Sequence, residues 1–178
     1  MKVKLTIVLI FFAFSSIFSA CLPHGNRGIY DDSGIKASDR LEQIISALDN
    51  KNADEIIAMF SVQALREAPN IEDGIEYLFS FVPEKIVSWE KVAGSSSSSN
   101  DYGIRTAGSS YWFYVYTEND KYLFFLKEYT IDTENPENIG LYMLQVIKAE
   151  DKETQFDGGG PNTRCAGIYM PPGGAIDE

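Results

Sequence analysis

The chain has 178 residues, of which 44% are apolar, and a formal net charge of −11 at pH 7. This length and apolar content suffice for one domain with a hydrophobic core. The acidic balance excludes nucleic acid as an expected partner and gives no attraction to anionic lipid, because both repel a strongly negative protein.

The first residues have the pattern of an exported protein. Met1–Lys4 is short and positively charged, and Leu5–Phe18 is an almost uninterrupted apolar run. Small residues then precede Cys21, as in a secretory signal that ends at a cleavage site. This end resembles the bacterial lipobox, with Phe18 where leucine is usual. We therefore predict that residues 1–20 are a lipoprotein signal peptide and that Cys21 becomes lipidated.

Two other interpretations of this segment remain open. An ordinary cleaved signal would have the same apolar run without a modified cysteine. An uncleaved membrane helix needs about 20 apolar residues, and this shorter run is followed at once by Pro23 and Gly25. A lipidated Cys21 would carry two acyl chains such as palmitate, which is enough for stable anchoring. The lipoprotein prediction places the protein on the extracytoplasmic side of the cell membrane, with the membrane as a partner.

The chain has two cysteines and one histidine, which limits its chemistry. With Cys21 acylated, Cys165 has no partner for an internal disulfide. His24 precedes the predicted domain, which therefore offers no Ser–His or Cys–His pair and no histidine-containing metal site. The acidic stretch Asp132–Asn138 has Pro136 at a ligand position of the EF-hand pattern and does not match it. We predict no catalytic residue, no metal site and no cofactor.

Residues 21–37 are rich in glycine and aspartate without periodicity, and we predict a tether there. A domain is predicted for residues 38–150, and it begins with three amphipathic helices. Each helix starts at a side chain that can cap a helix N-terminus. The predicted helices are Asp39–Leu48, Asn52–Phe60 and Asn70–Val82, the last of them ended by Pro83.

After the third helix the apolar period changes to that of extended strands. Ser95–Ser99 is predicted to be a flexible loop. The tail, residues 151–178, is predicted to be mostly irregular, although Ile168–Met170 could dock on the domain. This order of elements predicts an α+β fold, with the three helices on one face of a curved four-stranded antiparallel sheet. The predicted strands are Ile86–Ala93, Tyr102–Thr117, Lys121–Ile131 and Ile139–Ala149.

The second and third predicted strands carry aromatic side chains on both faces. Because side chains alternate along a strand, Trp112, Tyr114 and Tyr116 share one face of the second strand, and Tyr122 and Phe124 share one face of the third. The helices can cover only one face of the sheet, so the other needs a partner, the tail or a ligand. We predict either a self-association surface, giving a homodimer through the sheet face, or a ligand pocket rich in tyrosine hydroxyls.

Glu128 extends the Tyr122–Phe124 face of the third strand. If that face points inward, the carboxyl group could act as a general acid or base beside tyrosine hydroxyls. Its place near the end of the strand favours an ordinary solvent-exposed carboxylate over this catalytic role.

The order of helices followed by aromatic strands resembles the cone-shaped, cystatin-like folds of the nuclear-transport-factor-2-like superfamily. With the signal segment, the stretch Asp73–Glu76 and the aromatic hairpin, the chain is also similar to a family of uncharacterised bacterial lipoproteins, known as a domain of unknown function. The resemblance covers about residues 37–151. It implies a sheet and helices around a pocket, but this superfamily includes enzymes, binders and dimeric adaptors, so the fold does not give the function.

Three hypotheses follow from these patterns. The first is a lipid-anchored extracytoplasmic protein whose domain binds a small ligand or a protein without catalysis. The second is a pocket enzyme of the isomerase or dehydratase type, and the third is a self-associating structural component of the envelope. The sequence favours the first. The residues predicted to form the pocket or interface are Trp112, Tyr114, Tyr116, Tyr122, Phe124 and Glu128.

Overall fold

The computed structural model of the protein describes residues 33–171. The predictions for the signal peptide, for Cys21 and for most of the tether lie outside the described residues. Within the described part, no helix is both long enough and apolar enough to cross a membrane. The fold is α+β, as predicted, with helices that precede a sheet in the chain.

The helices before the sheet begin where local capping and apolar periodicity place them. They are α1 (Ser33–Asp49), α2 (Ala53–Met59), α3 (Val62–Glu67) and α4 (Ile71–Phe81). The side chains of Asn52 and Asn70 accept hydrogen bonds from the backbone N–H groups of Glu55 and Asp73, at 3.2 and 3.3 Å. These bonds satisfy N–H groups that have no partner inside the helix. The predicted starts of α2 and α4 are therefore confirmed.

Two features of the helices differ from the prediction. α1 begins at Ser33, so Asp39 lies inside it and caps nothing. The apolar stripe of α1 continues backward through Ala37, which is only 1% exposed, and this packing extends the helix. α3 was not predicted, because it is too short to show periodicity. Its N-terminus is capped by Ser61, whose hydroxyl accepts a hydrogen bond from Ala64 N at 3.0 Å.

The sheet has five strands in chain order, and the predicted four-stranded antiparallel sheet is wrong on this point. β1 to β4 form an antiparallel meander, and β5 pairs with β4 in parallel. β5 lies in the tail that was predicted to be irregular, although Ile168 docks as that prediction allowed. The strands are β1 (Ser88–Asp101), β2 (Ile104–Tyr116), β3 (Lys121–Asp132), β4 (Gly140–Lys148) and β5 (Gly167–Tyr169).

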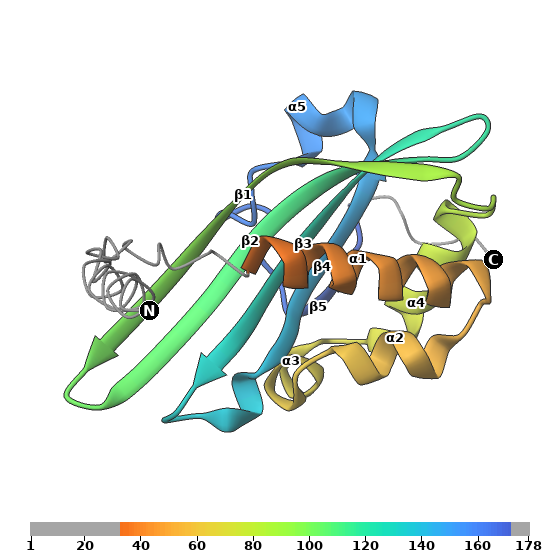
Figure 1. Ribbon diagram of the computed structural model, residues 1–178. Helices are drawn as coiled ribbons and strands as arrows, with labels where there is room; N and C mark the ends of the chain where they lie inside the picture. The colour runs from red at the N-terminus through yellow and green to blue at the C-terminus, as the bar shows by residue number, and fades with distance from the viewer. Residues whose placement is uncertain (1–32, 172–178) are drawn as a thin grey trace, which may run out of the picture. The chain divides into compact units, whose positions relative to one another are not determined.

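The serine run is part of a strand and not a loop. Ser95–Ser99 pairs residue by residue with β2, and the hairpin turns at Tyr102 and Gly103. Both turn residues have positive φ, 47° and 91°, as in the two-residue turns that match the twist of a hairpin. The small serines give little periodic signal, so their pairing with β2 decides the conformation. The paired ribbon of β1 and β2 extends beyond the helices (Figure 1).

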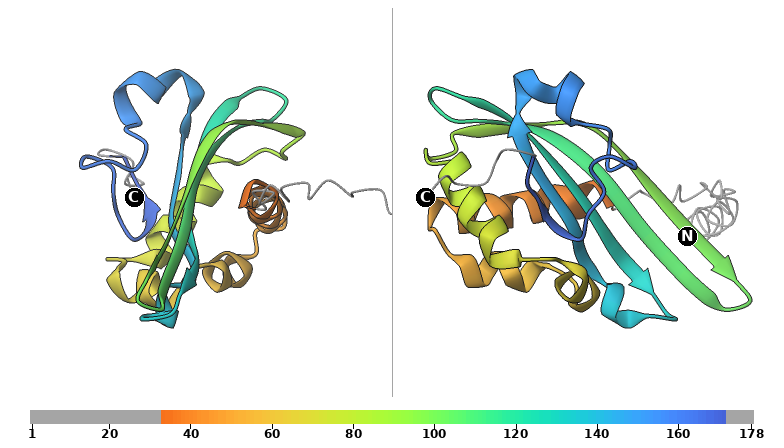
Figure 2. Two further views of the ribbon diagram at one scale, coloured as in Figure 1. Left: turned by 60° about the vertical axis from the view of Figure 1, so that its left-hand side comes forward. Right: turned by 180° about the vertical axis from the view of Figure 1, so that it is seen from behind.

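The sheet is the middle layer of three. α1 and α2 lie on one side of it, and the segment that contains α5 (Lys152–Gln155) and β5 lies on the other (Figure 2). We call the side that faces α1 the inner face, which carries Tyr111, Phe113 and Val115 of β2. The opposite side is the outer face. Short 3-10 turns follow β3 and β4, at Pro136–Asn138 and Ala149–Asp151.

The tail covers part of the outer face. The Phe156 ring packs against the rings of Trp112 and Phe125, with centroids 5.7 and 5.4 Å apart. The amide Nε2 of Gln145, a fully buried residue, donates a hydrogen bond to the backbone oxygen of Gln155 at 2.7 Å. The outer side of β3 and β4 is thereby buried by the chain's own tail, while β1 and the outer side of β2 stay more open.

Candidate functional site

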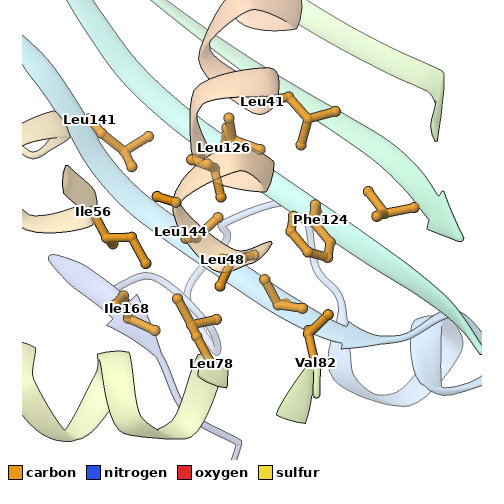
Figure 3. Close-up of a cluster of buried hydrophobic side chains, with 14 of the residues drawn as sticks. Leu41, Leu48, Ile56, Leu78, Val82, Phe124, Leu126, Leu141, Leu144 and Ile168 are labelled. Atoms are coloured by element: carbon orange, nitrogen blue, oxygen red, sulfur yellow. The ribbon is translucent and has the colours of Figure 1, made fainter. Parts of the chain in front are cut away.

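The space between the helices and the inner face is filled by a packed core. Phe124 is completely buried and lies among leucine, isoleucine and valine side chains from α1, α2, α4 and β4 (Figure 3). Tyr122 is also fully buried, and the Phe81 ring packs against it with centroids 5.7 Å apart. The structure therefore places two of the predicted site residues in the core, where they contribute packing.

The six predicted site residues do not come together. Val115 pairs with Tyr122 and Phe113 with Phe124, so Tyr122 and Phe124 belong to the inner face with those residues. Neighbouring residues of a strand point to opposite faces, so the other members of the set on β2 lie on the outer face. Glu128 also lies on the inner face, near the end of β3. The outer members are Trp112, Tyr114 and Tyr116.

Glu128 is buried and paired with a cation. The residue is 6% exposed, and its Oε2 lies 3.3 Å from Nε of Arg40 on α1. The same guanidinium donates a hydrogen bond to Gln43 at 2.9 Å. The buried hydroxyl of Ser109, opposite Glu128 in the sheet, has no hydrogen-bond partner in the described part. This ion pair fixes α1 on β3, because breaking a buried pair leaves an uncompensated charge.

The hydroxyl of Tyr122 belongs to a polar cluster at one end of the sheet. It donates a hydrogen bond to Asp120 at 3.2 Å and accepts one from Lys148 at 3.1 Å. Lys148 also pairs with Asp120 at 2.7 Å. Burial raises the pKa of Tyr122 although Lys148 opposes the shift, so the phenol stays protonated at neutral pH. The cluster ties the β2–β3 turn to β4 and does not converge on Glu128.

On the outer face, Trp112, Tyr114 and Tyr116 form a half-exposed aromatic strip. The ammonium group of Lys121 lies 3.6 Å from the centre of the Tyr114 ring and 5.1 Å from that of Tyr116. The Tyr116 hydroxyl donates to the carboxylate of Glu90. The protein's own side chains thus cover much of the strip, which is a surface and not a pocket.

A hollow of about 710 Å³ lies between α1 and the segment that leads into β1, and we call it the α1–β1 groove. Its apolar lining includes Ile45 of α1, Ile86 and Trp89, whose ring packs edge-on against Phe113 at 5.6 Å. Its volume falls in the range of small-molecule sites, which are largely apolar with a few polar groups. Its charged lining consists of Glu42, Asp49, Lys51, Glu84 and Lys85.

Hydrogen bonds hold both walls of the α1–β1 groove in place. The carboxylate of Asp49 accepts from Ile86 N at 3.2 Å. Lys51 donates to the backbone oxygens of Phe79 and Val82 at 3.0 and 3.3 Å. A site whose walls are already held in place loses less conformational entropy when a ligand binds. None of these residues was predicted to belong to a site, because the groove joins a helix end to an irregular segment that has no periodic signal.

A protein family described as Domain of unknown function (DUF5104) matches residues 43–149. The chain belongs to the DUF5104 family. The expectation of a domain of unknown function is thus confirmed. No curated protein matches the chain.

The DUF5104 match includes most of the α1–β1 groove and the aromatic strip, and it leaves out Arg40 and β5. Among the described residues, no cluster of histidine, cysteine or carboxylate side chains is placed to hold a metal ion. Cys165 is a half-buried free thiol in the described part of the tail. Burial raises the pKa of this thiol to about 11, so the nucleophilic thiolate is scarce at neutral pH.

Proposed function

We propose that this DUF5104 protein is an extracytoplasmic lipoprotein, anchored to the cell membrane through Cys21, whose domain binds a small amphipathic ligand in the α1–β1 groove without catalysis. One observation carries the binding role: the groove has the volume of a ligand site and a lining that is in part apolar, whereas the inner core is packed. The signal segment and the small residues before Cys21 support the anchor. The helices on one face of an antiparallel meander support a cone-like fold of the nuclear-transport-factor-2-like type.

The lining of the α1–β1 groove suggests the character of the ligand. Ile45, Ile86 and Trp89 offer an apolar contact for the body of the molecule. Carboxylates and lysines surround them, so a polar end of the ligand can stay near charged groups and water. The isomerase or dehydratase alternative has less support, because Glu128 is paired with Arg40 and the tyrosines of the predicted set point to both faces.

The anchor is tested on the two cysteines of the chain. The full-length protein is expressed in a bacterium, and mass spectrometry of its N-terminal peptide is compared with that of Cys21→Ser and Cys165→Ser. We expect a diacylglyceryl mass and membrane fractionation for the unchanged protein and for Cys165→Ser, and neither for Cys21→Ser. A mature protein with an unmodified Cys21 would refute the anchor and leave the groove proposal untouched.

The groove is tested with the two tryptophans of the chain, each of which reports on one surface. Trp112→Phe leaves Trp89 in the groove, and Trp89→Phe leaves Trp112 on the outer face. Each variant is titrated with the amphipathic dye anilinonaphthalenesulfonate while tryptophan emission is recorded. We expect a saturable change from Trp89 alone. Ser46→Phe, at an exposed groove position of α1, should weaken it, and Val62→Phe, at an exposed position of α3 that does not line the groove, should not.

The alternative outcomes of this titration are equally informative. A saturable response from Trp112 alone would refute the groove and place binding on the aromatic strip.

The half-exposed strip also supports a second candidate, a homodimer through the outer sheet face. Sedimentation of the unchanged protein over a range of concentrations tests that candidate, because Trp112→Ala should shift a dimer toward monomer while Trp89→Ala should not.

A further inference from the structure

A second hollow, of about 260 Å³, lies on the outer face, on the opposite side of the sheet from the α1–β1 groove. The backbone pairing places its side chains on three neighbouring strands. Glu128 and Ser109 also border the hollow, but both belong to the inner-face set of side chains, and the Glu128 carboxylate is paired there with Arg40. The outer-face residues that line it are Ser95, Ser97, Gly108, Ser110, Lys127 and Tyr129.

The groups around this hollow are hydrogen-bond donors, and none of them donates a hydrogen bond to another described residue. They are the hydroxyls of Ser95, Ser97, Ser110 and Tyr129, together with the ammonium group of Lys127, a half-buried residue. The contact found for that ammonium group is with the ring of Tyr142, 5.8 Å from its centre. In this part of the structure no carboxylate forms an ion pair with Lys127.

A second cation stands near Lys127. Burial lowers the pKa of Lys127, and the positive charge of Arg164 on the tail lowers it further. The guanidinium of Arg164 also forms no ion pair with any described residue. Glu67, which accepts hydrogen bonds from Tyr142 and Gln63, forms no ion pair with either cation. Lys127 therefore has a second cation in its neighbourhood and no carboxylate partner among the described residues, in a chain whose net charge is −11.

Such a set of donors is complementary to an oxyanion. Hydroxyls and an ammonium group can each donate to a different oxygen, and a tetrahedral phosphate presents more acceptor oxygens than a planar carboxylate. Partial burial strengthens the attraction, because the hollow is less screened than open surface. A bound anion would also compensate the repulsion between the two cations. These points favour phosphate over an uncharged ligand such as a sugar.

We propose that this hollow is a phosphate-binding site, in which Lys127 supplies the charge and the hydroxyls of Ser95, Ser97, Ser110 and Tyr129 orient the oxygens. The phosphate is either that of a small soluble ester or that of a lipid headgroup. The site does not depend on the proposed ligand of the α1–β1 groove, because the two lie on opposite faces of the sheet.

The test uses the full chain carrying Cys21→Ser, labelled with ¹⁵N and titrated with inorganic phosphate against chloride at constant ionic strength. We expect saturable amide shifts centred on Ser110 and Lys127. Lys127→Met should weaken binding at least about tenfold, because it removes the charge-assisted hydrogen bonds, and Lys127→Arg should retain most of it. Lys121→Met is the matched control, since that lysine is on the same face but lies on Tyr114.

Two results would overturn the site: shifts that do not saturate, or equal weakening by Lys127→Met and Lys121→Met. Binding of glycerol phosphate and of vesicles of phosphatidylcholine with phosphatidylglycerol is then compared, to distinguish a small soluble phosphate ester from a lipid headgroup. Lys127-dependent binding of the soluble ester alone identifies a soluble ligand, and Lys127-dependent binding of vesicles identifies a headgroup. The Trp89 titration of the groove is read separately, so failure of one site does not affect the other.

Discussion

Replacing Phe124 by alanine tests whether the inner face is a packed core or a ligand pocket. The side chain is completely buried between the sheet and the helices. Removing it loses about 2–3 kcal/mol of hydrophobic transfer free energy. The cavity left behind adds about 1–2 kcal/mol if the neighbours relax only in part. We therefore expect Phe124→Ala to lower the free energy of unfolding by about 4 kcal/mol, within the usual range for this substitution.

The assay is urea unfolding followed by tryptophan fluorescence. If the slope of the unfolding free energy against urea concentration is the same in both proteins, the shift of the midpoint reports a change in stability alone. A domain of this size has roughly 5–15 kcal/mol of stability, so the alanine variant could be marginal. Phe124→Leu, expected to cost about 1 kcal/mol, keeps the test usable. Tyr114→Ala is the control, because this half-exposed aromatic on the outer face should cost far less than Phe124→Ala.

The reasoning would be refuted if Phe124→Ala cost no more than Tyr114→Ala. That result would mean that the Phe124 ring already lies beside empty or water-filled space. The inner face would then be a pocket, and this result would support the isomerase or dehydratase hypothesis.

Three further predictions concern the tail. Gly74→Ala should lower the free energy of unfolding by about 1 kcal/mol despite the better helix propensity of alanine, because an added Cβ would lie 2.8 Å from Cβ of Ile168. Urea unfolding measures this change, and a gain in stability would contradict the close packing of α4 against Ile168. Alkylation of Cys165 at pH 8 should be about a hundredfold slower in the folded protein than in urea, since burial raises the thiol pKa from 9.0 to about 11; equal rates would show an undocked tail. Desolvation raises the pKa of Asp157, but hydrogen bonds from the Thr163 hydroxyl and from the backbone amides of Asn162, Gly160 and Thr163 outweigh it and lower the pKa. The stability that the carboxylate contributes is therefore present above pH 3.8 and lost as the pH falls through the lowered value, so local opening of residues 157–163, measured by hydrogen exchange, should increase there, and Asp157→Asn should flatten that pH dependence.

The parts of the fold that depend on neighbouring residues could be predicted from the sequence. Asn52 and Asn70 cap helices through bonds to residues three positions later, so their side chains are sufficient signals. The two-residue alternation of β2 and β3 likewise predicts two faces with aromatic side chains. In both cases the physical cause lies within a few residues of the pattern.

The parts that depend on distant residues could not be predicted. Ser95–Ser99 is extended because β2 pairs with it, and β5 is a strand because β4 does. The ion pair of Arg40 with Glu128 joins residues that are 88 positions apart. The six predicted site residues were correctly grouped along each strand, but the sheet register that separates the groups appears only in the structure.

Part of the outer face is covered by a segment that is synthesised after the four antiparallel strands. Until Phe156 and β5 have emerged, the meander of β1 to β4 has its apolar outer side exposed, with Phe125 and Ile147 unprotected. Domains that bury such surface late are prone to aggregate while it is exposed. We expect nascent chains that stop at residue 149 to need a chaperone, and the last twenty or so residues of the described part to convert an aggregation-prone intermediate into the native protein.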